Sequence, residues 1–451
     1  MRALLLNLPW REEQRLGVRA GSRWPFTSLP EKDGRIHYVP FPFFLAYAAA
    51  VLKREGKSVK LFDAIAEGVS EENFFKKIYC FNPEFILVET SCPSFKNDLR
   101  IIHKIRDILP DCQIALSGPQ ASVFPEKILR EYSIIKYILL GEYEYILLNL
   151  INCLEKKINL KSVSGLAYRE DGEIKINFSQ PAIDNLDSLP WPEREDMNIY
   201  KYNDGFAGLP VPNVQICASR GCPFQCNFCL WPQTIYKERK YRKRNPVDVV
   251  DEMEYLLNNF KFKAVYFDDD VFNINKDYVL NICNEIVKRK IKIPWAIMAR
   301  VDLMDKSLLK VMSGAGLYAV KYGIESGDQN ILNSCGKDMD LDKAYQAIRL
   351  TKQFGIKVHL TFCLGLPGET KQTIRRTVKF IRDVQPDSSQ FSLATPFPGT
   401  EYFEYLKNRG ELISEDWQSY DGNYKCVVQT PDLSSGELER IRIVLDNNFN
   451  A

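Results

Sequence analysis

Three cysteines stand close together near the middle of the chain, in the segment GCPFQCNFC at 221–229. Cys222, Cys226 and Cys229 follow the spacing C-x3-C-x2-C. Cysteine thiolates bind zinc and iron–sulfur clusters, and thiolates this close in sequence can reach a single metal centre. The spacing therefore predicts a metal site carried by one loop.

The number of available ligands decides which metal such a loop suits. Structural zinc takes four protein ligands, and the three histidines of the chain are distant in sequence: His37, His103 and His359. Cys217 lies in a predicted strand, and its offset from Cys222 fits neither usual zinc spacing. Three thiolates fit a [4Fe–4S] cluster in which one iron has no protein ligand, and a small molecule can bind at that iron.

The chain after residue 211 repeats a strand followed by a helix. Consecutive units of this kind form a parallel barrel, and six units rather than eight predict a partial (β/α)6 TIM-like barrel over 212–400. The predicted strands lie at 214–219, 264–269, 294–300, 317–326, 357–366 and 388–395. The cysteines follow the first of these strands, at the face where barrel active sites are built.

The first 155 residues alternate short apolar runs with amphipathic stretches, a pattern typical of a doubly wound, Rossmann-like α/β domain. The predicted strands lie at 2–8, 58–64, 85–90, 113–118 and 137–141. Their carboxyl ends would line a ligand crevice. The connection at 9–40 is long for a compact domain, which is typical of a functional loop.

Two further regions complete the predicted organisation. A β-hairpin with Asp171-Gly172 at its turn and a proline-rich linker occupy 156–211, and a C-terminal cap occupies 401–451. Most isolated cysteines, such as Cys80 and Cys283, are expected to be buried free thiols.

Composition excludes several classes of protein. A net charge of +2 over 451 residues gives no basic excess for binding nucleic acid. The longest apolar run, at 39–52, is too short for a membrane span, and no signal-peptide pattern is found. Twelve cysteines in such a chain do not indicate a disulfide framework. We therefore expect a cytoplasmic protein without a nucleic-acid or membrane partner.

The cysteine loop resembles that of the radical S-adenosylmethionine (SAM) enzymes, because Phe228 precedes its last cysteine and the loop follows strand one of a (β/α)6 domain. In that family the open iron binds the methionine amine and carboxylate of SAM. Reduction of the cluster then cleaves SAM to a 5′-deoxyadenosyl radical. The resemblance implies that the three cysteines are the metal ligands and the catalytic residues, and that Phe228 belongs to the cofactor site.

The resemblance extends to the ends of the later strands. It implies contacts to the methionine amine from Asp268, Asp269 and Asp270, and ribose and methionine contacts from Glu325 and Ser326. The segment 361–370 resembles the adenine-contacting segment of the family, and 394–400 closes strand six. Arg300, at the end of strand three, is expected either to bind a carboxylate of the cofactor or substrate or to form a surface salt bridge.

The N-terminal domain ahead of this barrel resembles that of the cobalamin-binding subfamily. Where related cobalamin domains have D-x-H-x-x-G, this chain reads DAIAEG at 63–68, so Ile65 replaces the axial histidine. Loss of that histidine does not exclude cobalamin, because the radical subfamily commonly lacks it. The candidate contacts, which are alternatively ordinary turn residues, are Ser91, Gly118, Gln120, Gly141 and Glu142.

The resemblance implies a cobalamin-dependent methyltransferase that acts on an unactivated carbon of a small molecule. Its partners would be that substrate and a reductant such as flavodoxin or ferredoxin. One alternative is a radical SAM dehydratase, cyclase or other rearrangement enzyme in which cobalamin is absent or is not a methyl donor. Another is a non-catalytic iron–sulfur or cobalamin carrier. An RNA methylthiotransferase is disfavoured, because 401–451 leaves no room for an RNA-binding barrel and no second cysteine triad lies upstream.

Overall fold

The computed structural model describes residues 1–18, 25–29, 38–177 and 182–449. It divides into two compact units. Unit 1 comprises 1–184, 188–201 and 230–238, and unit 2 comprises 185–187, 202–229 and 239–451. No helix among the described residues is long and apolar enough to cross a membrane.

Unit 1 is built on one large sheet, which in its described residues has the strand order β10-β9-β8-β7-β6-β1-β5. Five of these strands pair in parallel: β1 Arg2–Asn7, β5 Ser58–Asp63, β6 Phe85–Glu89, β7 Gln113–Ser117 and β8 Tyr137–Leu139. Strands β1, β6, β7 and β8 are almost continuously buried, as strands covered on both faces must be. The end strand β5 instead alternates exposed and buried residues along most of its length. The doubly wound fold that the sequence predicts is confirmed.

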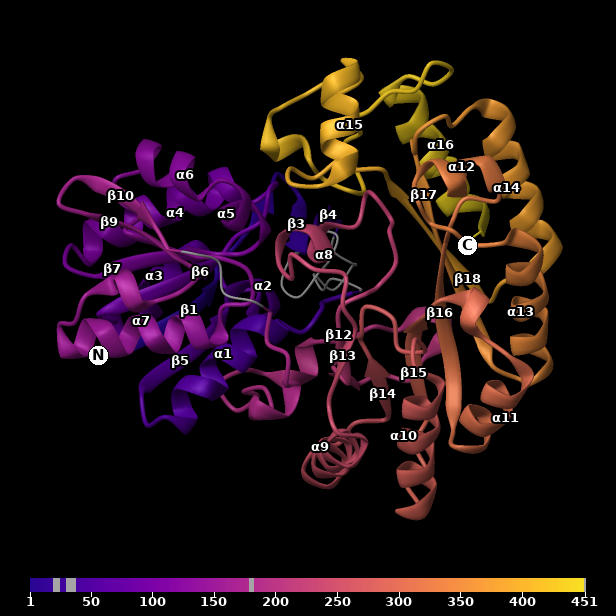
Figure 1. Cartoon of the computed structure of the whole chain (residues 1–451), viewed down its shortest axis with the longest axis horizontal. Helices are drawn as coiled ribbons and strands as arrows, with labels where there is room; N and C mark the ends of the chain where they lie inside the picture. Colours follow the sequence, from indigo (N-terminus) through magenta and orange to yellow (C-terminus); the bar gives the residue numbers. More distant parts are fainter. Residues whose placement is uncertain (19–24, 30–37, 178–181, 450–451) are drawn as a thin grey trace. The chain divides into compact units, whose positions relative to one another are not determined.

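The helices of unit 1 connect its parallel strands (Figure 1). Helix α1 packs against α7, and α3 packs against α4. Residues 43–52 of α1 are all buried, which explains why this apolar run forms a core helix. The bounds are α1 Phe43–Arg54, α2 Ala64–Glu67, α3 Glu71–Phe81, α4 Phe95–Ile108, α5 Pro119–Val123, α6 Pro125–Glu131, α7 Glu144–Lys156 and α8 Leu230–Thr234.

The predicted hairpin extends this sheet. Strands β9 (Leu166–Glu170) and β10 (Glu173–Ile176) pair antiparallel, and β9 also pairs with β8. Asp171 and Gly172 at the turn both have positive φ, 52° and 81°, as a two-residue type I′ turn requires. The Asp171-Gly172 turn is therefore where the sequence predicts it.

The long connection at 9–40 contains regular structure that the sequence did not reveal. Strands β2 (Arg11–Glu12), β3 (Arg15–Val18) and β4 (Phe26–Ser28) form a small antiparallel sheet. The rest of the predicted loop, 19–24 and 30–37, lies outside the described residues.

The expectation of buried free thiols is wrong for Cys80. This residue is exposed, because it lies on the solvent side of α3, whereas Cys283 is buried as expected.

Unit 2 is built on a parallel sheet whose described strands follow chain order, β11-β14-β15-β16-β17-β18. Strands β11 and β18 lie at its two ends, so the barrel is open, as six units predict. The bounds are β11 Asn213–Ile216, β14 Ala264–Phe267, β15 Trp295–Ala299, β16 Leu317–Glu325, β17 Lys357–Leu364 and β18 Ser388–Leu393. A short ribbon, β12 (Ser219–Arg220) with β13 (Arg242–Lys243), flanks the cysteines.

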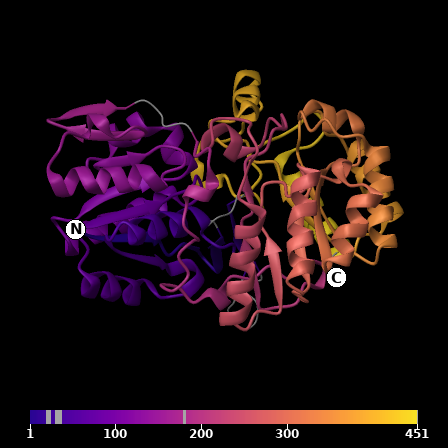
Figure 2. The same cartoon turned by 60° about the horizontal axis from the view of Figure 1, so that its bottom comes forward.

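The helices of unit 2 alternate with its strands (Figures 1 and 2). Helix α10 packs against both α9 and α11, and α13 packs against α14. The last helix, α16, lies in the predicted C-terminal cap and packs against the end strand β18. The bounds are α9 Pro246–Asn259, α10 Lys276–Lys288, α11 Lys306–Gly314, α12 Gln329–Ser334, α13 Leu341–Gln353, α14 Lys371–Val384, α15 Glu401–Arg409 and α16 Ser435–Phe449.

A buried ion pair lies at the amino-terminal end of this sheet. The Nζ of Lys321 stands 2.6 Å from Oδ2 of Asp204, and both side chains are less than 10% exposed. Lys321 also lies over the ring of Phe206, at 4.4 Å from its centroid. The turn at 206–208 is held to the starts of two strands, because Ser388 accepts from Ala207 N and Tyr318 donates to Gly208 O. This contact closes the end of the barrel opposite to the cysteines.

Substitution of Asp204 tests the contribution of this pair. Asp204→Asn should lower the stability of the cluster-free protein by about 3–5 kcal/mol, the usual cost of breaking a buried ion pair from one side. Urea unfolding followed by circular dichroism measures the change. Glu72→Gln breaks the exposed Lys76–Glu72 pair and should cost less than about 1 kcal/mol. Equal effects of the two variants would contradict this account.

Candidate active site

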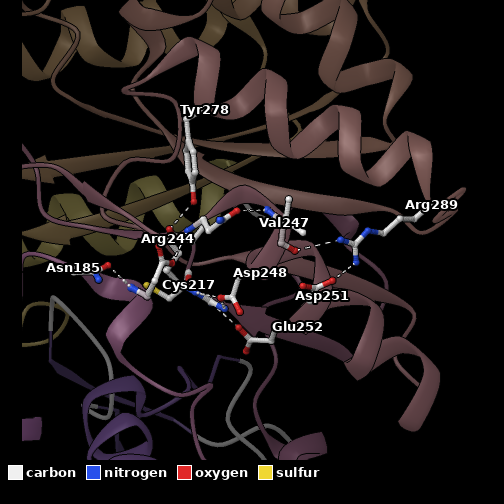
Figure 3. Close-up of polar contacts among 12 residues, drawn as sticks. Asn185, Cys217, Arg244, Val247, Asp248, Asp251, Glu252, Tyr278 and Arg289 are labelled. Carbon is white, nitrogen blue, oxygen red and sulfur yellow. Dashed lines mark hydrogen bonds and ion pairs between the residues drawn. The ribbon is translucent and has the colours of Figure 1, made fainter.

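The backbone leading into the cysteines is held by buried side chains of unit 2. The guanidinium of Arg244 donates to Cys217 O at 2.9 Å and pairs with Glu252 at 2.6 Å (Figure 3). The hydroxyl of Tyr278 donates to Ala218 O at 2.8 Å. These contacts fix the chain where β11 ends and the cysteine loop (221–229) begins.

Two of the carboxylates that follow β14 accept hydrogen bonds from Ser219 and Gly221, just before the first cysteine. Asp269 accepts from both the N–H and the hydroxyl of Ser219, and Asp270 accepts from Gly221 N at 2.7 Å. Gly221 has φ 88°, and a Cβ there would collide with Lys240 O, so this position requires glycine. The predicted contact of Asp268, Asp269 and Asp270 with the methionine amine of SAM stays a prediction.

The cysteine loop itself is tied to three other segments. Asn227 N donates to Cys335 O at 3.0 Å, and Tyr402 N donates to Asn227 O at 3.1 Å. The guanidinium of Arg239 donates to Phe224 O and, at 3.4 Å, to Cys226 O. The side chain of Phe228 is buried, which places this predicted residue in the interior of the loop. These hydrogen bonds define the path of the loop.

The surroundings of the three thiols shift their pKa values in opposite directions, upward for Cys222 and Cys229 and downward for Cys226. The hydrogen bond from Cys229, and beyond it the charge of Lys337, lower the pKa of the Cys226 thiol. Burial raises the pKa of Cys222 to about 11. Cysteine binds a metal as the thiolate. Of the three predicted ligands, Cys226 ionises most readily, because its pKa is lowered.

The three thiols suit a cluster, since they stand free on one loop. The ligands of a [4Fe–4S] cluster bind different irons and can stand further apart than those of a single ion. Cys222, Cys226 and Cys229, all free thiols on one anchored loop, therefore fit that group.

A buried lysine that the sequence did not reveal stands beside the triad. The Nζ of Lys337 lies 3.0 Å from Oε1 of Glu325, and both side chains are less than 15% exposed. Burial alone would lower the pKa of Lys337, but the carboxylate of Glu325 and the sulfur of Cys226 raise it, so the lysine is charged. Glu325 has φ 69°, an unusual conformation at the end of β16, where site residues are expected.

The structure brings Arg300 to the same place. Its guanidinium lies 3.6 Å from the ring centroid of Phe224, pairs with Asp302 and donates to Lys337 O at 3.0 Å. The salt bridge that the sequence offered as one alternative is therefore present, but the Arg300 side chain is only 4% exposed. Arg300 holds both the cysteine loop and the backbone of Lys337.

The remaining predicted SAM contacts lie nearby in the sheet. Ser326 is buried and accepts from Asp328 N at 3.2 Å. In the predicted adenine-contacting segment, Glu369 is buried and accepts from Gly365 N. Burial raises the pKa of the Glu369 carboxyl to about 8, although the hydrogen bond from Gly365 lowers it.

In unit 1, a pocket lies at the carboxyl ends of the parallel strands. Three of the five candidate cobalamin contacts line it: Ser91, Gly118 and Gly141. The other two make internal contacts, because Gln120 accepts from the Cys92 thiol and Glu142 accepts from Ile183 N. The pocket is also lined by Glu89 and Tyr143, joined by a hydrogen bond of 2.6 Å, and by Trp231, which the sequence did not indicate.

Comparison with known proteins identifies the two units. Residues 216–381 match the radical SAM superfamily, and residues 34–151 match the B12 binding domain. An uncharacterised methyltransferase of Pyrococcus horikoshii is 31% identical over 84% of this chain and 81% of its own length. The chain belongs to the radical SAM superfamily. It belongs to the group of that superfamily that also carries a B12-binding domain.

Three further likenesses agree with this assignment. The anaerobic magnesium-protoporphyrin IX monomethyl ester cyclase of Rubrivivax gelatinosus is 30% identical over 88% of this chain and 71% of its own length. Among solved structures, the cobalamin-dependent radical SAM enzyme OxsB has a TM-score of 0.76 at 19% identity. The match covers 99% of this chain and 66% of the OxsB chain. Radical SAM methyltransferase TsrM of Kitasatospora setae has a TM-score of 0.70 at 19% identity over 92% and 76% of the two chains.

These findings confirm the predicted fold class, family and enzyme class. The cofactors that the sequence predicts, a [4Fe–4S] cluster, SAM and cobalamin, are those of a radical SAM enzyme with a B12-binding domain. The individual residue roles are not tested by the comparisons and remain predictions.

Removal of the Asp270 carboxylate tests whether it holds the cysteine loop for the cluster. Asp270→Ala deletes a hydrogen bond to a charged group, worth roughly 1.5–3 kcal/mol, so the loop should retain the cluster less well. Iron per chain after anaerobic reconstitution should fall, and visible absorbance should be lost faster in a chelator. Asp277→Ala, an exposed carboxylate on α10, should retain the cluster as the unsubstituted protein does.

The raised pKa of Glu369 predicts a pH dependence of stability. Its folded pKa of about 8 exceeds the ordinary value of 4.5. Between these values the native state binds more protons than the unfolded chain, so this group's contribution to stability is lost as pH rises. The urea midpoint should therefore fall less from pH 5 to pH 8.5 in Glu369→Gln than in the unsubstituted protein. Glu404→Gln, at an exposed carboxyl, should not change the pH profile.

Proposed function

We propose that this protein is a cobalamin-dependent radical SAM methyltransferase that acts on an unactivated carbon of a small molecule. The observation that carries the proposal is the joint presence, in one chain, of the anchored three-cysteine loop and a B12-binding unit with a pocket at its strand ends. The Pyrococcus horikoshii relative is named as a methyltransferase. It is 31% identical to this chain, and the match covers 81% of its length.

Each unit would hold one part of the cofactor set. Cys222, Cys226 and Cys229 would hold the cluster, with SAM at the open iron, and the pocket at Ser91, Gly118 and Gly141 would hold cobalamin. When bound, the cluster supplies the electron that activates SAM, and cobalamin carries the methyl group. The protein's own task is to orient these groups and to exclude water.

The charged groups near the triad have distinct roles in this proposal. The carboxylate of Glu325, which the Lys337 ammonium orients at 3.0 Å, would accept a hydrogen bond from SAM. Ser326 would contribute to the same contact. Asp268 would bind the methionine amine, while Asp269 and Asp270 hold the loop backbone.

The reaction needs a source of low-potential electrons. We propose that a flavodoxin or a ferredoxin supplies them and that the protein works in the cytoplasm. The described cysteines are all free, which agrees with a reducing compartment. The substrate class, a small molecule, is inferred from the family, in which a solved structure of TsrM is described with a tryptophan substrate bound.

A second candidate function is a radical rearrangement, such as oxidative ring formation, in which cobalamin is not a methyl donor. The Rubrivivax gelatinosus relative, 30% identical over 88% of this chain, is named as a cyclase. The two candidates share the radical step and differ in whether a SAM molecule donates its methyl group.

The products of SAM distinguish the candidates. Reconstituted protein with SAM, hydroxocobalamin and a low-potential reductant should form 5′-deoxyadenosine and also S-adenosylhomocysteine, the by-product of methyl donation. Liquid chromatography with mass detection measures both. 5′-Deoxyadenosine alone indicates the rearrangement, and neither product indicates a carrier.

Two sets of variants control this experiment. The triple variant Cys222→Ala, Cys226→Ala, Cys229→Ala should form no 5′-deoxyadenosine, and its formation there would falsify the ligand assignment. Cys217→Ala is the matched control, because Cys217 is buried five residues upstream with its thiol on Ser219 O at 3.0 Å. That variant should keep both products.

A further inference from the structure

A short stretch that follows the last cysteine belongs to the other compact unit. Residues 230–238, which we call the bridge segment, group with unit 1, whereas 202–229 and everything from Arg239 onward group with unit 2. The bridge segment begins directly after Cys229 and contains α8. One of the three predicted cluster ligands is thus covalently joined to a part of the B12-binding unit.

Aromatic packing holds the bridge segment within unit 1. The ring of Trp231 lies 5.1 Å from that of Phe44, edge to face, and 6.1 Å from that of Tyr236. Phe44 in turn lies 6.0 Å from Tyr143. The Trp231 side chain is buried, with 8% of it exposed. Such buried aromatic contacts fix the position of the segment on α1 and on the strand ends.

The bridge segment also forms part of the wall of the unit 1 pocket. Leu230, Trp231 and Ile235 line it together with the predicted contacts Ser91 and Gly118. A Cβ at Gly141 would stand only 2.8 Å from Ile235 O, so glycine is needed for the segment to approach this closely. The pocket is therefore complete only when the bridge segment is in place.

Both ends of the bridge segment are tied to the cysteine loop of unit 2. At its start the tie is the peptide bond to Cys229. At its end, the guanidinium of Arg239 donates to the carbonyl groups of Phe224 and Cys226.

We propose that the bridge segment couples the two cofactor sites, with Trp231 as a wall residue of the pocket that would hold the corrinoid. This inference rests on the proposed function, in which cobalamin occupies the unit 1 pocket. Binding of the cluster would hold Cys229, at the start of the bridge segment, and would so add to the aromatic contacts that keep the pocket wall in place before the corrinoid binds. The coupling is positive and reciprocal.

The first test needs no variant. Hydroxocobalamin should bind reconstituted protein roughly 5- to 150-fold more tightly than it binds cluster-free protein, the range typical of coupled sites. Equilibrium dialysis with absorbance detection gives both dissociation constants. Equal constants overturn the coupling but leave cobalamin dependence intact. Absence of binding in both states overturns the proposed function itself.

The second test addresses Trp231. Trp231→Ala should weaken hydroxocobalamin binding to the reconstituted protein and reduce the difference between cluster-loaded and cluster-free protein. Trp231→Phe should restore most of the affinity, because it restores an aromatic ring against Phe44. Trp417→Ala, a half-exposed tryptophan of unit 2, is the matched control and should bind as the unsubstituted protein does.

A readout at the other site completes the test. Hydroxocobalamin should slow iron release from the reconstituted protein to a chelator, and Trp231→Ala should remove this protection. Iron content and the unfolding midpoint of each variant show whether it is folded and loaded. Unchanged affinity and unchanged protection in a folded Trp231→Ala overturn the role of Trp231.

Discussion

The rest of this structure depends on how the backbone at 217–221 is held, because this segment leads directly into the loop that carries the three thiols. Buried backbone groups need partners, and here side chains from several elements supply them: Arg244 and Tyr278 donate to carbonyl groups, and Asp269 and Asp270 accept from N–H groups. Little conformational freedom is left in this stretch. The loop is therefore prepared for its ligand by hydrogen bonds of the sheet rather than by the ligand alone.

Charge balance around the cysteine loop follows from the same arrangement. Three thiolates on one loop repel one another, and buried cations lower that cost. Lys337 is the cation that faces Cys226, and Glu325 keeps it charged in a buried place. Arg300 is paired with Asp302 and so acts on the loop mainly through its contacts with Phe224 and the carbonyl of Lys337. Arg300 thus supplies position, while the charges of both Lys337 and Arg300 lower the pKa of the Cys226 thiol.

Local sequence patterns were sufficient for the fold and for the position of the triad. Each of three features produces a pattern within a few residues: the parallel strands, the turn at Asp171-Gly172 and the cysteine loop after the first barrel strand. The structure contains all three features at the predicted places. Lys337 could not be found in this way, because its contact with Glu325 depends on a turn after α12 that brings the two residues together. The partners of Asp269 and Asp270 also lie about fifty residues away.

The bridge segment escaped prediction for a related reason. Its apolar residues follow a metal-binding motif, so the sequence associates them with the barrel, whereas their packing partners are Phe44 and the strand ends of unit 1. This division makes the three cysteines unequal. Asp270, through Gly221, and the contacts of Asn227 hold the path of the chain at Cys222 and Cys226 from within unit 2. Cys229 alone is followed by residues that belong to unit 1. The proposed coupling would therefore act on the triad at its last ligand.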